Sequence, residues 1–438
     1  MHRPPAFQNS AIILLALCAA SCDGATESPT GPPPAGSVAQ IQALSGMNQM
    51  AWPGWPVSTV LRVRVTDAVG NGVAGMPVTF TVTAGGGTIA SAPAATDTAG
   101  VAASEVWTLG PDSGEQHVQA SSGSASTSFT AFAIQPHFAL KGRLAFVSAV
   151  DGNADIYTMN ADGTGIERLT TDPEQELQPV WAPAGDQLAF TVGDAGSTRI
   201  HTMNADGSNV KGLTPEQSYS SDPSWSAGPD GLKLAYASQR DGSDDIVSLN
   251  TSTGVVSVLA GLPGYDGQPS WSPDGRRLAF VSDYEFYDFV LDVFTMNADG
   301  TGQVPITHSM NLGASPMRYY QHPAWSPDGN LIAFVWGEDF GSSVGVSFHV
   351  AVMAPDGSGV RNLAWAGDIN RYHYFLDPGS LAWSPDGRGI AFSFADCEGG
   401  TADGVPGPVC PTRSVKYVPL TGGEAVTLIP NGHSPSWR

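Results

Sequence analysis

Short runs in which apolar residues occupy every second position recur along most of the chain. Before residue 134 the clearest are V-L-R-V-R-V-T at 60–66, P-V-T-F-T-V-T at 77–83 and T-S-F-T-A-F-A at 127–133. This alternation is typical of a strand with one buried face, because successive side chains of a strand point to opposite sides. Clusters rich in glycine and aspartate separate the runs, as expected of turns. The pattern predicts an all-β protein that begins with a β-sandwich at residues 38–134.

From about residue 140 a longer unit repeats six times. Each copy contains a tryptophan, usually followed by a tight turn and a small apolar strand such as L-A-F or I-A-F. The six tryptophans are Trp181, Trp225, Trp271, Trp325, Trp383 and Trp437, at spacings of 44 to 58 residues. Repeats of this length, with about four short strands each, indicate the blades of a β-propeller.

The two ends of the repeat region complement each other. The first copy, with L-A-F at 144–146, has no tryptophan strand before it, and the chain finishes with S-P-S-W-R at 434–438. We therefore expect the last residues to supply the innermost strand of the first blade. This pairing would close a six-bladed β-propeller over residues 138–438 and leave no open strand edge to aggregate.

Both regions resemble known families. The string V-T-D-A-V-G-N-G-V-A-G-M-P-V-T-F-T-V-T-A-G-G-G-T-I at 65–89 resembles the bacterial immunoglobulin-like domain of the invasin/intimin type. That resemblance implies an immunoglobulin-like sandwich at 38–134 that serves as a spacer. The strings W-S-P-D-G-R-R-L-A-F-V-S at 271–282 and D-I-Y-T-M-N-A-D-G-T-G at 155–165 resemble the TolB-like, WD-type propeller repeat. Such blades occur in envelope proteins, in peptidase gating domains and in some polysaccharide lyases.

Residues 1–22 have the features of a lipoprotein signal peptide. The apolar stretch at 11–20 is half the ~20 residues of a membrane span and suits the core of a signal peptide. The string A-A-S-C at 19–22 resembles the lipobox of bacterial lipoproteins, which implies cleavage before Cys22 and acylation of its thiol. Secretion without a lipid is the alternative. A linker rich in proline and glycine follows at 23–37.

Charge and cysteine content narrow the possible partners and the compartment. The chain has 41 Asp and Glu against 19 Lys and Arg, a formal net charge of −22. Such an acidic protein repels phosphate backbones, so we expect no nucleic-acid partner. Cys397 and Cys410 bracket a loop rich in glycine and proline, and in an exported protein such a pair predicts a disulfide.

The innermost strands of the blades line the central channel, so equivalent positions of the repeat should meet at one channel mouth. The residue three positions before each tryptophan is polar in every copy: Gln178, Asp222, Gln268, His322, Ser380 and Ser434. His433 and His373 lie close to these positions in sequence. Our candidates for binding a peptide, a sugar or a cation at this mouth are Gln178, Asp222, Gln268, His322 and His433. A channel filled with water is the alternative interpretation.

Signals for catalysis are weak. In lyases with this fold a His/Gln cluster holds a divalent metal, but here the histidines do not share one repeat position, so we predict neither catalytic nor metal-binding residues. The aspartate-rich loops 151–155 and 241–245 offer oxygen ligands for weak Ca²⁺ binding, or act only as hairpin turns. No other cofactor is expected. Insertions rich in aromatic residues, at 284–291, 307–320 and 366–374, form a binding rim or cover their own blades.

These observations together predict a monomeric, exported lipoprotein of the bacterial cell envelope that faces the periplasm or the cell surface. It is expected to have no enzymatic activity and to bind an envelope protein or glycan through the propeller face, with the immunoglobulin-like domain as spacer. One alternative is a metal-assisted enzyme that acts on polysaccharide at the channel mouth. Another is a purely structural surface protein.

Overall fold

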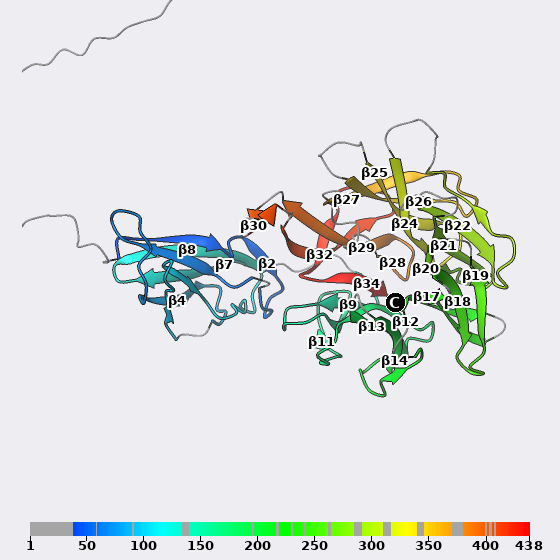
Figure 1. Cartoon of the computed structure of the whole chain (residues 1–438), viewed down its shortest axis with the longest axis horizontal. Helices are drawn as coiled ribbons and strands as arrows, with labels where there is room; N and C mark the ends of the chain where they lie inside the picture. The colour runs from blue at the N-terminus through cyan, green and yellow to red at the C-terminus, as the bar shows by residue number, and fades with distance from the viewer. Residues whose placement is uncertain are drawn as a thin grey trace, which may run out of the picture.

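The computed structural model describes residues 38–57, 59–89, 92–133, 140–194, 197–215, 219–228, 231–240, 242–261, 264–283, 291–309, 317–339, 346–369, 380–398, 401–402, 405–406 and 409–438. Within these ranges the regular structure consists of strands, and no helix is long and apolar enough to cross a membrane. Figure 1 shows an elongated body made by the N-terminal strands beside a disc of blade-like sheets. The prediction of an all-β protein is confirmed.

Residues 38–133 form two sheets, ordered β1-β3-β6 and β2-β8-β7-β4-β5, around one hydrophobic core. The strands are β1 (Gln40–Ser45), β2 (Gln49–Ala51), β3 (Arg62–Thr66), β4 (Pro77–Ala84), β5 (Ala94–Ala95), β6 (Val101–Ala103), β7 (Gly114–Ser122) and β8 (Ala125–Ala133). The alternation seen in the sequence decides which side chains enter the core. Val63 and Val65 of β3 and Phe129 of β8 are fully buried. The assignment of this body to the immunoglobulin-like class stays a prediction.

The rest of the described chain forms six four-stranded sheets, which we call blades 1 to 6. Blade 1 is β9 (Arg143–Ser148), β10 (Asp155–Asn160), β11 (Glu167–Arg168) and β34 (His433–Trp437). Blade 2 is β12 (Glu176–Trp181), β13 (Gln187–Asp194), β14 (Ser197–Asn204) and β15 (Lys211–Gly212), and blade 3 is β16 (Ser220–Gly228), β17 (Gly231–Arg240), β18 (Ser243–Asn250) and β19 (Val256–Ala260).

Blades 4 to 6 continue the pattern. Blade 4 is β20 (Asp266–Trp271), β21 (Arg277–Ser282), β22 (Asp292–Asn297) and β23 (Val304–Pro305), and blade 5 is β24 (Met317–Trp325), β25 (Ile332–Asp339), β26 (Val346–Met353) and β27 (Arg361–Ile369). Blade 6 is β28 (Leu381–Trp383), β29 (Gly389–Glu398), β32 (Val409–Pro419) and β33 (Val426–Pro430), and the short strands β30 (Thr401–Ala402) and β31 (Val405–Pro406) pair between β29 and β32. Neighbouring strands within each blade are antiparallel, and the six predicted copies of the repeat correspond to six sheets.

Blade 1 joins the two ends of the repeat region. Its strand order is β11-β10-β9-β34, and β34 pairs antiparallel with β9. The backbone N–H of Arg438 donates to the carbonyl of Arg143 at 2.9 Å. The indole N–H of the largely buried Trp437 donates to the carbonyl of Lys141, also at 2.9 Å. The predicted closure of the ring by the last residues is confirmed.

The repeated tryptophans pack between neighbouring blades. Trp181 of blade 2, for example, shares a hydrophobic cluster with Ala145 and Ile156 of blade 1. The turn after such a tryptophan is held by its own side chains: the Ser272 hydroxyl donates to Asp274 and accepts the N–H of Arg277. The W-S-P-D-G string therefore encodes both the contact between blades and the sharp turn that follows it.

The N-terminal body packs directly on the place where the propeller closes. Trp52, just after β2, is 2% exposed and belongs to the same hydrophobic cluster as Phe146 and Trp437. The rings of Trp52 and Phe146 are 6.1 Å apart, and those of Trp55 and Tyr157 are 5.5 Å apart. Two tryptophans of the first body are thus part of the core that joins blades 6 and 1, which the sequence pattern did not indicate.

Candidate functional site

A β-bulge interrupts the innermost strand of five blades. In β12 the register shifts between Leu177 and Val180, and comparable shifts occur in β16, β20, β24 and β34. Each bulge holds a residue followed by proline, and the residue before the proline has a positive φ: Gln178 (51°), Asp222 (54°), Gln268 (52°), His322 (52°) and Ser434 (49°). Residues other than glycine rarely adopt this backbone conformation. A bulge turns the affected side chain in a new direction, which here is the central channel.

These residues converge on one cavity of about 120 Å³. Its walls contain the six residues that we name the ring: Gln178, Asp222, Gln268, His322, Ser380 and Ser434. The proline that follows a ring residue also lines the cavity in five blades, and in blade 6 Leu381 takes that place. The structure therefore brings together four of the five predicted binding candidates, and their role in binding stays a prediction.

Hydrogen bonds tie ring residues of successive blades to one another. The Gln178 side-chain amide donates to the Asp222 carboxylate, and its oxygen accepts the backbone N–H of Asp222 at 3.1 Å and the Thr191 hydroxyl at 2.8 Å. Further round, the oxygen of Gln268 accepts the backbone N–H of His322 at 2.7 Å. In both places a glutamine of one blade binds a backbone N–H at the bulge of the next blade. These bonds hold the side chains of Gln178 and Gln268 against the neighbouring blade.

His433 is the candidate whose expected place was wrong. Its side chain is 8% exposed, and its backbone lies opposite Val147 of β9. Its Nδ1 is 3.0 Å from the hydroxyl of Ser434, which lines the cavity where His433 does not. The positive φ at the bulge belongs to Ser434, the residue before the proline, and it is this residue that lines the cavity.

Several other predictions fall on parts of the chain that lie outside the described residues. They concern Cys22, His373, most of the insertions at 284–291, 307–320 and 366–374, and the side chains of Cys397 and Cys410. The disulfide and the acylation site therefore stay predictions.

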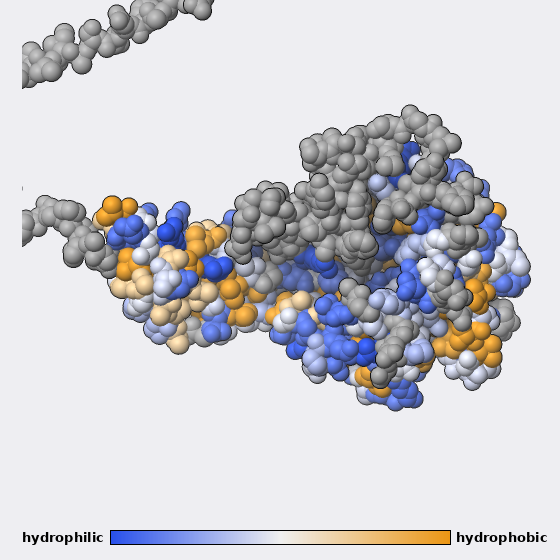
Figure 2. All heavy atoms as spheres, in the orientation of Figure 1, coloured by the Kyte–Doolittle hydropathy of each residue, from blue (hydrophilic) through white to orange (hydrophobic). Residues whose placement is uncertain are grey.

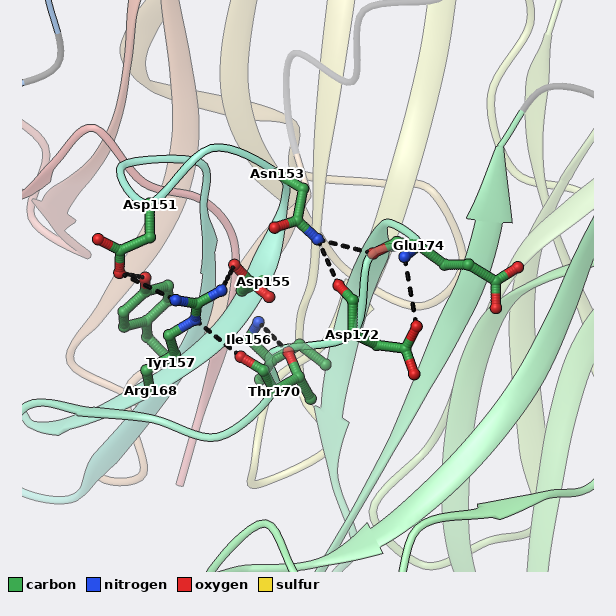
Figure 3. A network of polar contacts seen from close by, with 9 residues as sticks. All are labelled: Asp151, Asn153, Asp155, Ile156, Tyr157, Arg168, Thr170, Asp172 and Glu174. Carbon is green, nitrogen blue, oxygen red and sulfur yellow. Dashed lines mark hydrogen bonds and ion pairs between the residues drawn. The ribbon is translucent and has the colours of Figure 1, made fainter.

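The aspartate-rich loop before β10 is part of a polar network (Figure 3). Arg168 lies between two carboxylates, with guanidinium nitrogens 2.6 Å from Asp155 and 3.5 Å from Asp151. The Tyr157 hydroxyl donates to Asp151 at 2.6 Å, and burial together with this bond raises the pKa of Tyr157 well above its ordinary value. In the loop 151–155, a cation from the protein thus already lies between the two carboxylates, and Ca²⁺ binding at the loop 241–245 stays a prediction. Among the described residues, no group of three or more His, Cys, Asp or Glu side chains is arranged to hold a metal ion.

A second hollow, of about 750 Å³, lies between the outer parts of blades 3 and 4. Lys233, Arg276 and Asn250 contribute polar groups to its wall, and Val255 and Val258 contribute apolar ones. Figure 2 shows apolar surface at the lower right of the propeller, where β18 and β19 lie. The carbonyl of the Asn250 side chain is used within its own turn, where it accepts two backbone N–H groups. The ring, whose side chains from six blades face one space, is the stronger candidate.

The fold and the ring define a six-bladed β-propeller whose channel mouth is lined by polar residues at one repeat position. The family model of the TolB beta propeller domain matches residues 115–260 and 227–393. The chain belongs to this family.

Relatives with curated sequences match only part of the chain. An uncharacterized protein of Agrobacterium fabrum is 29% identical over 169 residues, which are 37% of this chain and 52% of that protein. An uncharacterized peptidase of Bacillus subtilis is 28% identical over 193 residues, which are 38% of this chain and 28% of the peptidase. The chain thus spans about half or less of the length of these relatives. The crystal structure of TolB from Acinetobacter baumannii is similar in fold, with a TM-score of 0.50, 17% identity, and coverage of 74% of this chain and 80% of that one.

Proposed function

We propose that this protein is a non-catalytic binding protein of the bacterial cell envelope and that the ring is its docking site. The N-terminal body serves as a spacer of the immunoglobulin-like class, held to the membrane by a lipid on Cys22. Membership of the TolB beta propeller domain family and the short apolar stretch before Cys22 both support an envelope address.

The size of the ring cavity is the observation that carries this proposal. A volume of about 120 Å³ corresponds to about four water molecules, at ~30 Å³ each. Sites that enclose a whole small molecule usually measure about 300–1,000 Å³. The cavity therefore suits one protruding group of a larger partner, such as a single side chain of a protein or the end of a glycan.

The chemistry of the ring favours recognition over reaction. Its two ionisable groups, Asp222 and His322, come from blades 3 and 5, which are not neighbours in the ring. The glutamines next to them are hydrogen-bonded to the neighbouring bulge, and this fixes their position. Fixed donors and acceptors around a small hollow provide selectivity for the shape and polarity of the group that enters.

A photocrosslinking experiment in living cells tests the proposal. A photoreactive amino acid replaces Ser380, a ring position that has neither the proline nor a charged group, and the same amino acid replaces Val255 on the edge of blade 3 as the matched control. We expect a discrete crosslinked product with one envelope component from position 380 and none with that component from position 255.

The second arm of this experiment adds Asp222→Asn to the chain that carries the crosslinker at 380. Hydrogen bonds to charged groups contribute about 1.5–3 kcal/mol, so we expect binding to weaken by roughly 10- to 100-fold and the product to fade accordingly. A product that is equally strong from both crosslinker positions, or that Asp222→Asn leaves unchanged, would contradict the assignment of the ring as the docking site.

A further inference from the structure

A second pair of acidic side chains lies buried between blades 1 and 2. Asp155 begins β10 and is fully buried, and Glu176 begins β12 and is 2% exposed. Each carboxyl group is close enough to the other to influence its pKa, and the backbone N–H of Glu176 donates to the carbonyl of Ala154 at 2.8 Å. The pair therefore lies at a point where the two blades touch through both backbone and side chains.

Asp155 and Glu176 have different charged neighbours. Arg168 donates to Asp155 at 2.6 Å and also lies near Asp151, as Figure 3 shows. Glu176 has the Thr170 hydroxyl as a donor, while the nearby charges of Asp155 and Asp172 oppose its ionisation. One oxygen of each carboxyl, Oδ1 of Asp155 and Oε2 of Glu176, is buried and accepts no hydrogen bond. Two carboxylate oxygens can form a hydrogen bond with each other only if a proton lies between them.

The contact between blades 4 and 5 can be compared with the contact between blades 1 and 2. Asp292 begins β22 as Asp155 begins β10, but its oxygens accept from the hydroxyls of Thr307 and Ser309 and from a backbone N–H. The residue that corresponds to Glu176 is Tyr320, five positions before the tryptophan of its blade, and its N–H donates to the carbonyl of Leu291. The backbone contact is thus the same in both places, and the contact between blades 4 and 5 lacks the second carboxyl.

We propose that Asp155 and Glu176 share one proton and form a pH-sensitive joint between blades 1 and 2. Loss of the proton would leave two buried carboxylates, Asp155 and Glu176, charged and side by side. Arg168 would then be one cation for three acidic groups, because it also lies near Asp151, and the contact between the blades would loosen. Burial raises the pKa of Glu176 to about 7, and the pKa of Asp155 is raised as well. The change would therefore fall in the range of pH that an envelope protein can meet.

The joint is positioned to affect the ring. Gln178 follows Glu176 by two residues on β12, and its side chain binds Asp222 of blade 3. A shift of the start of β12 would move this ring residue and weaken its bond to the next blade. This consequence for binding rests on the proposed function, whereas the shared proton itself does not.

Infrared spectroscopy of the unmodified protein tests for the shared proton directly. At pH 5.5 we expect an absorption of one protonated, buried carboxyl group, and we expect it to disappear between pH 6 and 8. The variant Glu176→Gln should lack this band, whereas Glu167→Gln, an exposed glutamate in an ion pair with Arg143, should keep it. Absence of the band in the unmodified protein at pH 5.5, or its persistence in Glu176→Gln, would overturn the proposal.

Thermal unfolding gives the second readout. The folded protein holds a proton that the unfolded chain releases, because the ordinary glutamate pKa of 4.5 lies below the raised one. Stability from this pair is therefore highest at low pH and is lost as the pH rises to about 7. We expect the melting temperature to fall by a few degrees from pH 5.5 to 8, and Glu176→Gln, which resembles the protonated acid, to reduce this fall. An equal fall in Glu176→Gln and in Glu167→Gln would count against the joint, independently of any result on binding.

Discussion

Closure of the propeller by its last strand makes Trp437→Ala a sharp test of the fold. Trp437 is 9% exposed, packs edge-on against Tyr417 at 5.8 Å and donates its indole N–H to the carbonyl of Lys141. A tryptophan buries about 150–250 Å², which at ~25 cal/mol per Å² corresponds to about 4–6 kcal/mol. Partial collapse of the surroundings reduces such losses to about 3–5 kcal/mol in practice, and the unpartnered carbonyl adds roughly 1 kcal/mol. We expect a total loss of at least about 4 kcal/mol.

Urea unfolding followed by far-ultraviolet circular dichroism measures this loss without relying on tryptophan fluorescence. A loss of about 4 kcal/mol should lower the midpoint by at least about 1 M, since the slope for small proteins is about 1–3 kcal/mol per M. The matched control is Trp365→Ala, because Trp365 is 44% exposed and its truncation should cost less than half as much. An equal midpoint for Trp437→Ala and the unmodified protein would refute the idea that β34 holds the ring closed. Deletion of residues 430–438 should go further and abolish cooperative unfolding of the propeller.

Two further predictions concern the connections of the propeller to the rest of the chain. Trp52→Ala should destabilise the protein by about 3–5 kcal/mol in the same urea assay, because its ring lies in the core shared with blade 1, whereas Met50→Ala, at a side chain 46% exposed, should change the midpoint little. A Trp52 variant as stable as the Met50 variant would show that the two bodies are energetically independent. Cys22→Ser should move the protein from the membrane fraction to the soluble fraction of fractionated cells, since it removes the thiol that would carry the lipid. Unchanged membrane association would contradict lipid anchoring.

The architecture of the propeller could be predicted from the sequence because its signals are local and repeated. A tryptophan recurs six times, usually with a tight turn and a short apolar strand after it, and each feature has a structural explanation. The closure followed from counting, since the first copy lacked the strand that Trp437 supplies at the end. The convergence of the ring followed from symmetry alone, because equivalent positions on blades must meet around the axis.

The sequence pattern could not show contacts that no repeat imposes. Trp52 lies in a segment without a partner pattern, so its docking on blade 1 depends on the shape of two finished bodies. The repeat places an acidic residue at the position of Asp155 in other blades too, so the sequence alone does not single out the pair with Glu176, whose proximity follows from the packing of two blades. One usable signal was missed: the residue–proline pair that recurs at five ring positions, which indicates a bulge. That signal also decides between His433 and Ser434, because the residue directly before the proline is the one turned toward the channel.

The bulge explains why the ring can vary from blade to blade while the propeller stays the same. At each bulge the residue before the proline has a positive φ, and its side chain lines the cavity whatever its type. Glutamine, aspartate, histidine and serine all occur there with φ between 49° and 54°. The backbone conformation at the bulge does not require a particular side chain, so the residue at this position can differ between blades without a change of fold. Under the proposed function, the identities of Asp222 and His322 therefore carry information about the partner that the rest of the repeat does not.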